Sequence, residues 1–114
     1  MTDQPRTPVA EALFVRLVAQ PGKGDEVERF LRDGLAAVME QPDTTSWYAV
    51  RFGRHEFAIF DTFPNNAARL AHLSGKVGTA LIARTPELLE SPPQIEYAQV
   101  LAYKLPDDSG QAAR

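Results

Sequence analysis

The chain has two histidines, His55 and His72, and His72 is the better candidate for acid–base chemistry because it lies in a predicted helix. An imidazole has a reference pKa of about 6.5, so near neutral pH it can take the proton of a phenol. A deprotonated phenol is electron-rich enough to give an electron to oxygen. The alternative is a half-buried structural histidine that donates one hydrogen bond to a carbonyl group.

Two adjacent aromatic residues, Trp47 and Tyr48, could form the wall of a site for a planar ligand. Neighbouring residues of a strand point to opposite faces, so one of the two side chains must face away from the other. Aromatic side chains of a small domain also serve as ordinary packing. Trp47 is therefore a candidate pocket residue, and Tyr48 is a candidate for either a ligand site or an interface between subunits.

Three charged residues, Arg51, Asp61 and Arg69, lie inside or beside apolar segments. An unpaired buried charge is costly, so we predict an ion pair between Arg51 and Asp61 across a sheet. The functional alternative is an arginine that holds the carboxylate or phenolate of a ligand. For Asn65 and Asn66 we favour a role as a helix cap, and the alternative is a pair of polar groups that activate oxygen.

The sequence offers little for a metal or a nucleotide. It has no cysteine, so a zinc site would need mostly carboxylate ligands beside its two histidines. The glycines near position 23 have neither the phosphate-loop nor the dinucleotide-binding spacing. We therefore predict neither a metal nor a cofactor.

Alternating and helical patterns predict the elements that must position these residues. Strands are expected over 11–20, 45–52, 56–63 and 94–105, and helical segments over 23–40, 65–73, 76–84 and 86–90. The order β-α-β-β-α-β is typical of the ferredoxin-like α+β fold, with a four-stranded antiparallel sheet and helices on one face.

A length of 114 residues fits one domain, placed at 11–105 between flexible segments at 1–10 and 106–114. The net charge of −3 argues against a nucleic-acid or polybasic membrane partner, and no apolar run could span a bilayer, so we expect a cytoplasmic protein. The first strand is apolar on both faces, so the sheet face without helices needs a cover. We predict a homodimer that buries this open sheet face.

The runs Trp47–Gly53, Phe57–Pro64 and Arg69–Val77 resemble the antibiotic biosynthesis monooxygenase superfamily, over about residues 13–104. The resemblance implies a dimeric α+β barrel. Members of that superfamily include cofactor-free monooxygenases of phenolic polyketides or quinols and haem-degrading enzymes. By the resemblance, the candidate catalytic residues are His72, Trp47 and Asn66.

The resulting hypothesis is a cofactor-independent monooxygenase of a small hydroxylated aromatic, with Arg51, Tyr48 and Arg69 as candidate substrate-binding residues. A non-catalytic dimeric protein that binds a small molecule is the alternative. Haem binding or degradation through His72 is a further one, although the first strand lacks the asparagine of haem degraders and has Arg16 as its long polar residue.

Overall fold

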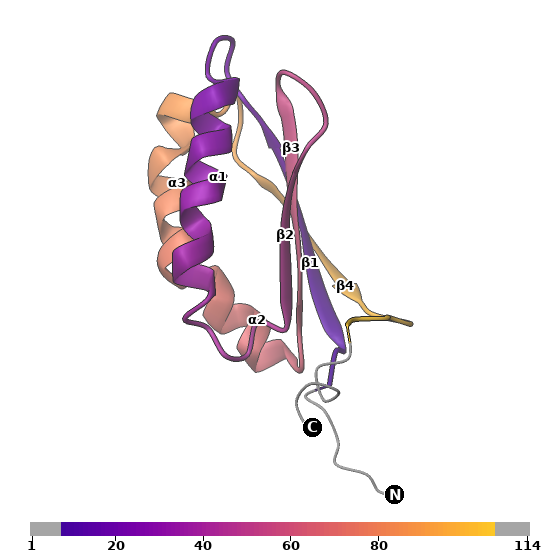
Figure 1. The fold of residues 1–114 in the computed structure, drawn as a ribbon. Coiled ribbons are helices and arrows are strands. Elements are labelled where there is room, and N and C mark those ends of the chain that lie inside the picture. The colour runs from indigo at the N-terminus through magenta and orange to yellow at the C-terminus, as the bar shows by residue number, and fades with distance from the viewer. Residues whose placement is uncertain (1–7, 107–114) are drawn as a thin grey trace, which may run out of the picture.

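A computed structural model describes residues 8–106 and shows the predicted ferredoxin-like fold. The elements are β1 (Glu11–Val18), α1 (Gly24–Val38), β2 (Ser46–Arg51), β3 (Glu56–Phe63), α2 (Asn66–Leu73), α3 (Lys76–Leu88) and β4 (Gln94–Gln99). The strands form one antiparallel sheet in the order β2-β3-β1-β4, and the helices cover one of its faces (Figure 1). The flexible segments predicted at 1–10 and 106–114 fall mostly outside the described residues. Within 8–106, no helix has the length and apolar character to cross a membrane.

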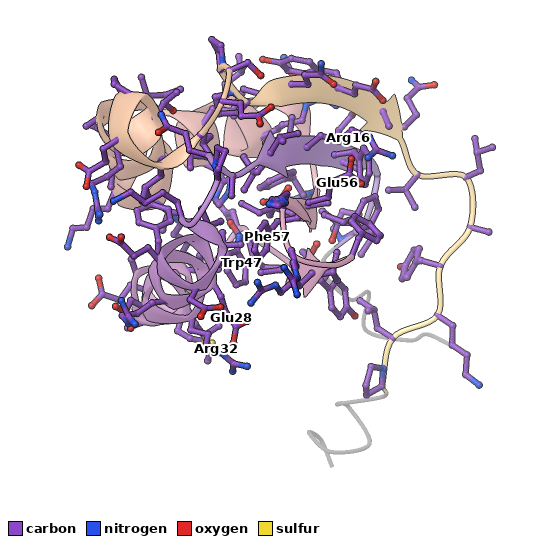
Figure 2. The ribbon with its side chains drawn as sticks, turned by 90° about the horizontal axis from the view of Figure 1, so that it is seen from above. Arg16, Glu28, Arg32, Trp47, Glu56 and Phe57 are labelled. Atoms are coloured by element: carbon purple, nitrogen blue, oxygen red, sulfur yellow. The ribbon has the colours of Figure 1, made fainter. Side chains whose placement is uncertain are left out.

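Two predicted boundaries are wrong. Pro86 does not begin a separate helical segment, because α3 continues through it to Leu88. Just before Pro86, the Thr85 hydroxyl donates to the Leu81 carbonyl one turn earlier (2.8 Å). β4 ends at Gln99 rather than at residue 105. Gln99 pairs with Glu11, the first residue of β1, and one more backbone hydrogen bond follows, from Val100 N–H to the Ala10 carbonyl (2.8 Å). Residues 101–106 then leave the body of the domain (Figure 2).

The core lies between the sheet and the helices. Every second residue of the central strands points toward the helices, as the alternation of a strand requires. The buried apolar side chains of this layer are Leu13, Val15, Leu17, Phe57, Ile59 and Phe63 from the strands and Val27, Leu31, Leu81 and Leu88 from the helices. Trp47 packs against this cluster and so faces the helices.

The other sheet face carries large apolar side chains that no helix of the domain covers. Tyr48 is the Cα partner of Phe60, and the two are 52% and 39% exposed. Val50, farther along β2, is also exposed. Tyr48 and Trp47 therefore point to opposite faces of β2.

A short break separates α2 from α3. Asn65 caps the start of α2, because its side chain accepts from the Ala68 N–H (2.8 Å), as the sequence predicts. The Ser74 hydroxyl closes the other end by donating to the carbonyl of Leu70 (3.2 Å). A Cβ atom on Gly78 would lie 2.3 Å from the Leu73 carbonyl oxygen, so the lack of a side chain there lets α3 start directly against the end of α2.

Candidate functional site

A buried acid–base pair joins the sheet to helix α2. His72 Nε2 lies 2.8 Å from Asp61 Oδ2. Asp61 is on the helix-facing side of β3, in the same alternation as Ile59 and Phe63, and is 1% exposed. His72 is in the last turn of α2 and is 9% exposed, with its ring centroid 5.2 Å from that of Phe63. The fold thus brings together two groups that can exchange a proton away from water.

The second nitrogen of His72 is also engaged. Its Nδ1 lies 2.6 Å from Gln41 Oε1, and the Thr44 hydroxyl donates to the same oxygen (2.8 Å). An amide oxygen only accepts, so His72 Nδ1 carries a proton. One further proton lies between His72 Nε2 and Asp61 Oδ2. The pair is therefore either an imidazolium beside a carboxylate or a neutral imidazole beside a carboxylic acid.

The surroundings of Asp61 favour its neutral form. Burial raises the pKa of the Asp61 carboxyl group above its ordinary value, while the hydrogen bond from His72 acts in the opposite direction. Perturbed carboxyl groups with a specific partner are frequent at functional sites. The two protonation states of the pair are thus drawn closer in energy than they would be in water.

A small cavity of about 60 Å³ adjoins the pair. Its lining is mostly apolar and includes Ile59, Val77 and Leu81. The other lining residues that matter for chemistry are Trp47, Asp61 and His72. Two polar atoms of these residues, Trp47 Nε1 and Asp61 Oδ1, are buried and have no hydrogen-bond partner among residues 8–106.

A larger groove of about 480 Å³ lies between α1 and β2, and Trp47 lines it as well. Figure 2 shows Trp47 and Phe57 between the sheet and helix α1, which carries Glu28 and Arg32. The groove is wide enough for a small aromatic molecule, whereas the cavity is far below the size of an ordinary ligand pocket. Tyr48 and Arg51 also line it.

The predicted ion pair between Arg51 and Asp61 is wrong. Arg51 Nη1 instead lies 2.6 Å from Glu28 Oε1 and 3.2 Å from Asp25 Oδ1. Its guanidinium stacks over the Phe57 ring at 5.0 Å. The cause is the register: Arg51 is the partner of Phe57, and Asp61 lies four residues farther along β3, about 13 Å away at the rise of a strand.

Arg69 and Asn66 lie together, but away from the cavity. The Arg69 guanidinium donates to the carbonyls of Ala12 (3.1 Å) and Ala98 (3.0 Å) and stacks over the Tyr97 ring at 4.8 Å. Its Nε and Nη2 groups donate to Asn66 Oδ1, and its Nη1 also lies 3.2 Å from the Glu11 carboxylate. Arg69 therefore links α2 to the two neighbouring strands β1 and β4. Of the residues singled out from the sequence, the structure brings His72, Trp47 and Asp61 to the cavity. It brings Trp47, Tyr48 and Arg51 to the larger groove.

Asp61 is the site residue whose role the sequence reasoning missed. A signal was present, because Asp61 shares the alternation of Phe57, Ile59 and Phe63, all of which point inward. A carboxylate at such a position needs a partner from the helical layer. His72 is the one histidine that a predicted helix carries.

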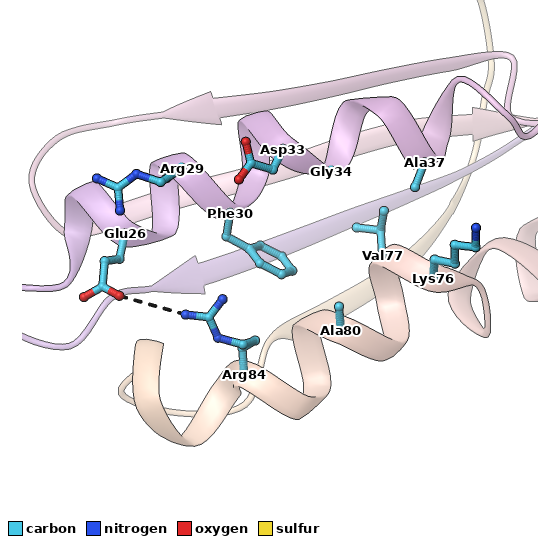
Figure 3. Close-up of a pocket in the computed structure, with 10 residues that line it drawn as sticks. All are labelled: Glu26, Arg29, Phe30, Asp33, Gly34, Ala37, Lys76, Val77, Ala80 and Arg84. Carbon is cyan, nitrogen blue, oxygen red and sulfur yellow. Dashed lines mark ion pairs between the residues drawn. The ribbon is translucent and has the colours of Figure 1, made fainter.

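The groove between α1 and α3 and the potential metal-ligating side chains give less support for a functional site. A groove of about 310 Å³ between α1 and α3 is crossed by an ion pair of Glu26 and Arg84 at 3.9 Å (Figure 3). Its charged side chains are exposed or half-buried, and it contains no histidine. Over residues 8–106, no three His, Asp or Glu side chains gather to hold a metal ion.

Comparison with solved structures shows which family the chain belongs to. A protein of unknown function from Nitrosomonas europaea is 42% identical, with a TM-score of 0.86, over 90% of this chain and 99% of that one. The chain belongs to its family, within the antibiotic biosynthesis monooxygenase-like fold. Two proteins provisionally named antibiotic biosynthesis monooxygenases share this fold at lower identity. The one from Caulobacter crescentus is 19% identical, with a TM-score of 0.71, over 84% of this chain and 93% of its own.

The second of these, from Chloroflexus aurantiacus, is 16% identical, with a TM-score of 0.66, over 83% of this chain and 96% of its own. Neither a protein-family model nor a curated sequence matches the chain. The resemblance predicted from the sequence is confirmed at the level of the fold. A shared fold hosts many activities, so the activity has to be argued from the site.

Proposed function

We propose that the chain is a cofactor-independent monooxygenase that oxidises a small hydroxylated aromatic with molecular oxygen. The observation that supports it is the buried Asp61–His72 pair, which meets Trp47 at an otherwise apolar cavity. An acid–base pair in an apolar site can ionise a phenol away from water, where the resulting charge is most reactive. The names of the proteins that share the fold are in keeping with this activity.

The reaction balances without an external reductant. With 1-naphthol as substrate, loss of the hydroxyl proton gives an anion that can pass an electron to oxygen. The ring C–H bond is then replaced by C=O, and the O–O bond breaks. One oxygen atom stays in the naphthoquinone product and the other leaves as water, so the substrate supplies all the electrons.

His72 is suited to be the proton relay of this reaction. Its Nε2 faces buried Asp61, and its Nδ1 faces Gln41 and Thr44. The latter two residues line an outer groove of about 370 Å³. A proton taken up inside the domain can thus be passed toward the surface through the imidazole.

Oxygen uptake with 1-naphthol tests the proposal. His72→Gln removes the relay, and we expect the rate to fall by about 10²- to 10⁴-fold, the usual effect of losing an acid–base group. The matched control is His55→Gln, since His55 lies exposed in the turn between β2 and β3, away from the cavity. Uptake that is absent in the unchanged protein with 1-naphthol and quinols, or equal in the two variants, contradicts the proposal.

We also propose that two copies associate through the open sheet face. The exposed apolar residues Tyr48, Val50 and Phe60 support this, because an apolar sheet face in water is normally covered. Leu101 and Tyr103 are exposed in the segment that leaves the domain, where a second copy could cover them.

Sedimentation velocity tests the association. Phe60→Asp should convert a dimer into a monomer, whereas Met39→Asp, which changes an exposed apolar residue of the helical layer, should leave the dimer intact. A monomer at micromolar concentration in the unchanged protein contradicts a stable dimer.

A non-catalytic binding protein is the second candidate. The groove of about 480 Å³ favours it, because this larger hollow is not lined by Asp61 or His72. Saturable binding of 1-naphthol without oxygen uptake would select this function. Haem binding is less suited to the geometry, since both nitrogens of His72 already have partners. A Soret band on adding haem that disappears in His72→Ala would select it.

A further inference from the structure

Two unpartnered polar atoms of the cavity are complementary. Asp61 Oδ1 is an acceptor when the carboxyl group is ionised, and Trp47 Nε1–H is a donor only. The two residues are direct partners on β3 and β2, so their side chains leave the sheet on the same face. A buried polar atom without a partner costs free energy, so a ligand that satisfies both atoms is favoured.

A hydroxyl group meets this requirement. It donates one hydrogen bond and accepts others, so it can donate to Asp61 Oδ1 while it accepts from Trp47 Nε1. An ether or a ketone oxygen satisfies only the tryptophan, and an ammonium group only the carboxylate. The chemistry of the two free atoms therefore selects among ligand groups.

We infer that Trp47 and Asp61 form a subsite for one hydroxyl group of the ligand, and that Asp61 takes its proton. Both nitrogens of His72 are engaged, which leaves Asp61 Oδ1 as the free acceptor of the pair. Asp61 is then the catalytic base, and His72 is a positioning and relay residue. The binding part of this inference stands alone, whereas the role of Asp61 as a base rests on the proposed function.

The proton transfer is balanced. The O–H bond of the ligand breaks, its electron pair stays on the ligand oxygen, and an O–H bond forms at Asp61 Oδ1. If the shared proton starts on His72 Nε2, the product is a phenolate and an imidazolium on either side of a neutral carboxyl group. The N–H of Trp47 then donates to the phenolate oxygen, where the negative charge has developed.

The two hollows divide the ligand between them. A cavity of about 60 Å³ has room for a hydroxyl group or a few water molecules but not for an aromatic ring. The groove of about 480 Å³ has room for the ring. Trp47 lines both hollows, so a ring in the groove can direct its hydroxyl group past the edge of the indole toward Asp61.

The single tryptophan makes the subsite directly observable. The protein gives one indole N–H signal by NMR, and this signal belongs to Trp47. We expect 1-naphthol to shift it and to bind about ten- to a hundredfold more tightly than 1-methoxynaphthalene, which cannot donate to Asp61. This comparison uses the unchanged protein and so does not depend on the folding of a variant. Equal affinities for the two compounds, or no binding of either, overturn the inference.

Two variants test whether the preference for the hydroxyl group comes from Trp47 Nε1 and Asp61 Oδ1. Trp47→Phe keeps an aromatic ring without the N–H, and Asp61→Asn replaces the charged acceptor with an amide. We expect each to reduce the preference for 1-naphthol, measured by calorimetry, about tenfold. The matched control is Tyr103→Phe, which removes a hydroxyl group from the exposed segment after β4, lines neither hollow and should leave the preference unchanged. A preference that survives in both site variants overturns the inference.

The same measurements separate this inference from the proposed function. A hydroxyl preference that depends on Trp47 and Asp61 without oxygen uptake supports the subsite and contradicts the monooxygenase. Oxygen uptake that depends on His72 supports the monooxygenase. If the preference for 1-naphthol then does not depend on Trp47 and Asp61, the subsite is overturned.

Discussion

Replacing Arg69 by methionine tests whether this buried side chain holds the fold together. Methionine keeps most of the length of the side chain and its apolar contacts, so the change isolates the polar ones. The guanidinium reaches four acceptors: the Glu11 carboxylate (3.2 Å), the Ala12 and Ala98 carbonyls (3.1 and 3.0 Å) and Asn66 Oδ1 (2.8 Å).

The expected cost follows from these contacts. A hydrogen bond contributes about 0.5–1.5 kcal/mol net, so the three uncharged acceptors together suggest about 3 kcal/mol. The ion pair with Glu11 adds little, because that carboxylate is partly exposed. For a domain of this size, about 3 kcal/mol corresponds to a fall in Tm of roughly 12 °C.

Urea unfolding followed by the fluorescence of Trp47 measures this cost. The control is Arg32→Met, since Arg32 is 77% exposed and, within residues 8–106, pairs only with Glu28 one turn away, so its loss should cost under about 0.5 kcal/mol. Unfolding free energies that fall equally in the two variants, or by less than about 1 kcal/mol in Arg69→Met, would refute a stabilising role for Arg69. A stable Arg69→Met that no longer binds 1-naphthol would instead support the substrate-binding role considered from the sequence.

Three further perturbations test features of the site and its supports. Gly78→Ala places a Cβ atom 2.3 Å from the Leu73 carbonyl and should destabilise the domain by about 1–3 kcal/mol, whereas Gly53→Ala, with nothing within 4 Å, should be nearly neutral in the same urea assay. Asn65→Ala removes the cap of α2 and should lower the free energy of unfolding by about 1 kcal/mol, measured from the fall in Tm. Burial raises the pKa of Asp61, so its contribution to stability is fully present below its unfolded pKa of about 3.9 and is lost as pH rises through the folded value. The unfolding free energy of the parent minus that of Asp61→Asn should therefore fall between pH 4 and pH 7, and a constant difference would contradict the raised pKa.

The fold could be predicted from the sequence because each helix and strand is indicated by the residue pattern of its own segment. The alternation in 56–63 and the helical spacing in 23–40 each indicate an element without knowledge of the rest of the chain. The end of β4 could not be found in this way. The apolar alternation continues beyond Gln99, but β1 begins at its partner Glu11, and within residues 8–106 the pairing ends one hydrogen bond later, between Val100 N–H and the Ala10 carbonyl.

The site depended on register, which the pattern of one strand does not contain. The hairpin of β2 and β3 places Trp47, not Arg51, opposite Asp61, and this decides which residue faces the cavity and which faces Glu28. The contact of His72 with Asp61 joins two elements through the core. Sequence reasoning identified His72 by its chemistry but could not identify its partner.

The break between α2 and α3 gives the two parts of the site separate supports. The hydrogen bonds of His72 depend on α2 and on the loop that follows α1, whereas Val77, Leu81 and Ile82 of α3 form much of the cavity wall. Substitutions in α3 can therefore enlarge or reshape the cavity while the proton path stays in place. Under the proposed function, the size of the ligand and the transfer of its proton would therefore depend on different helices, so a change in one need not disturb the other.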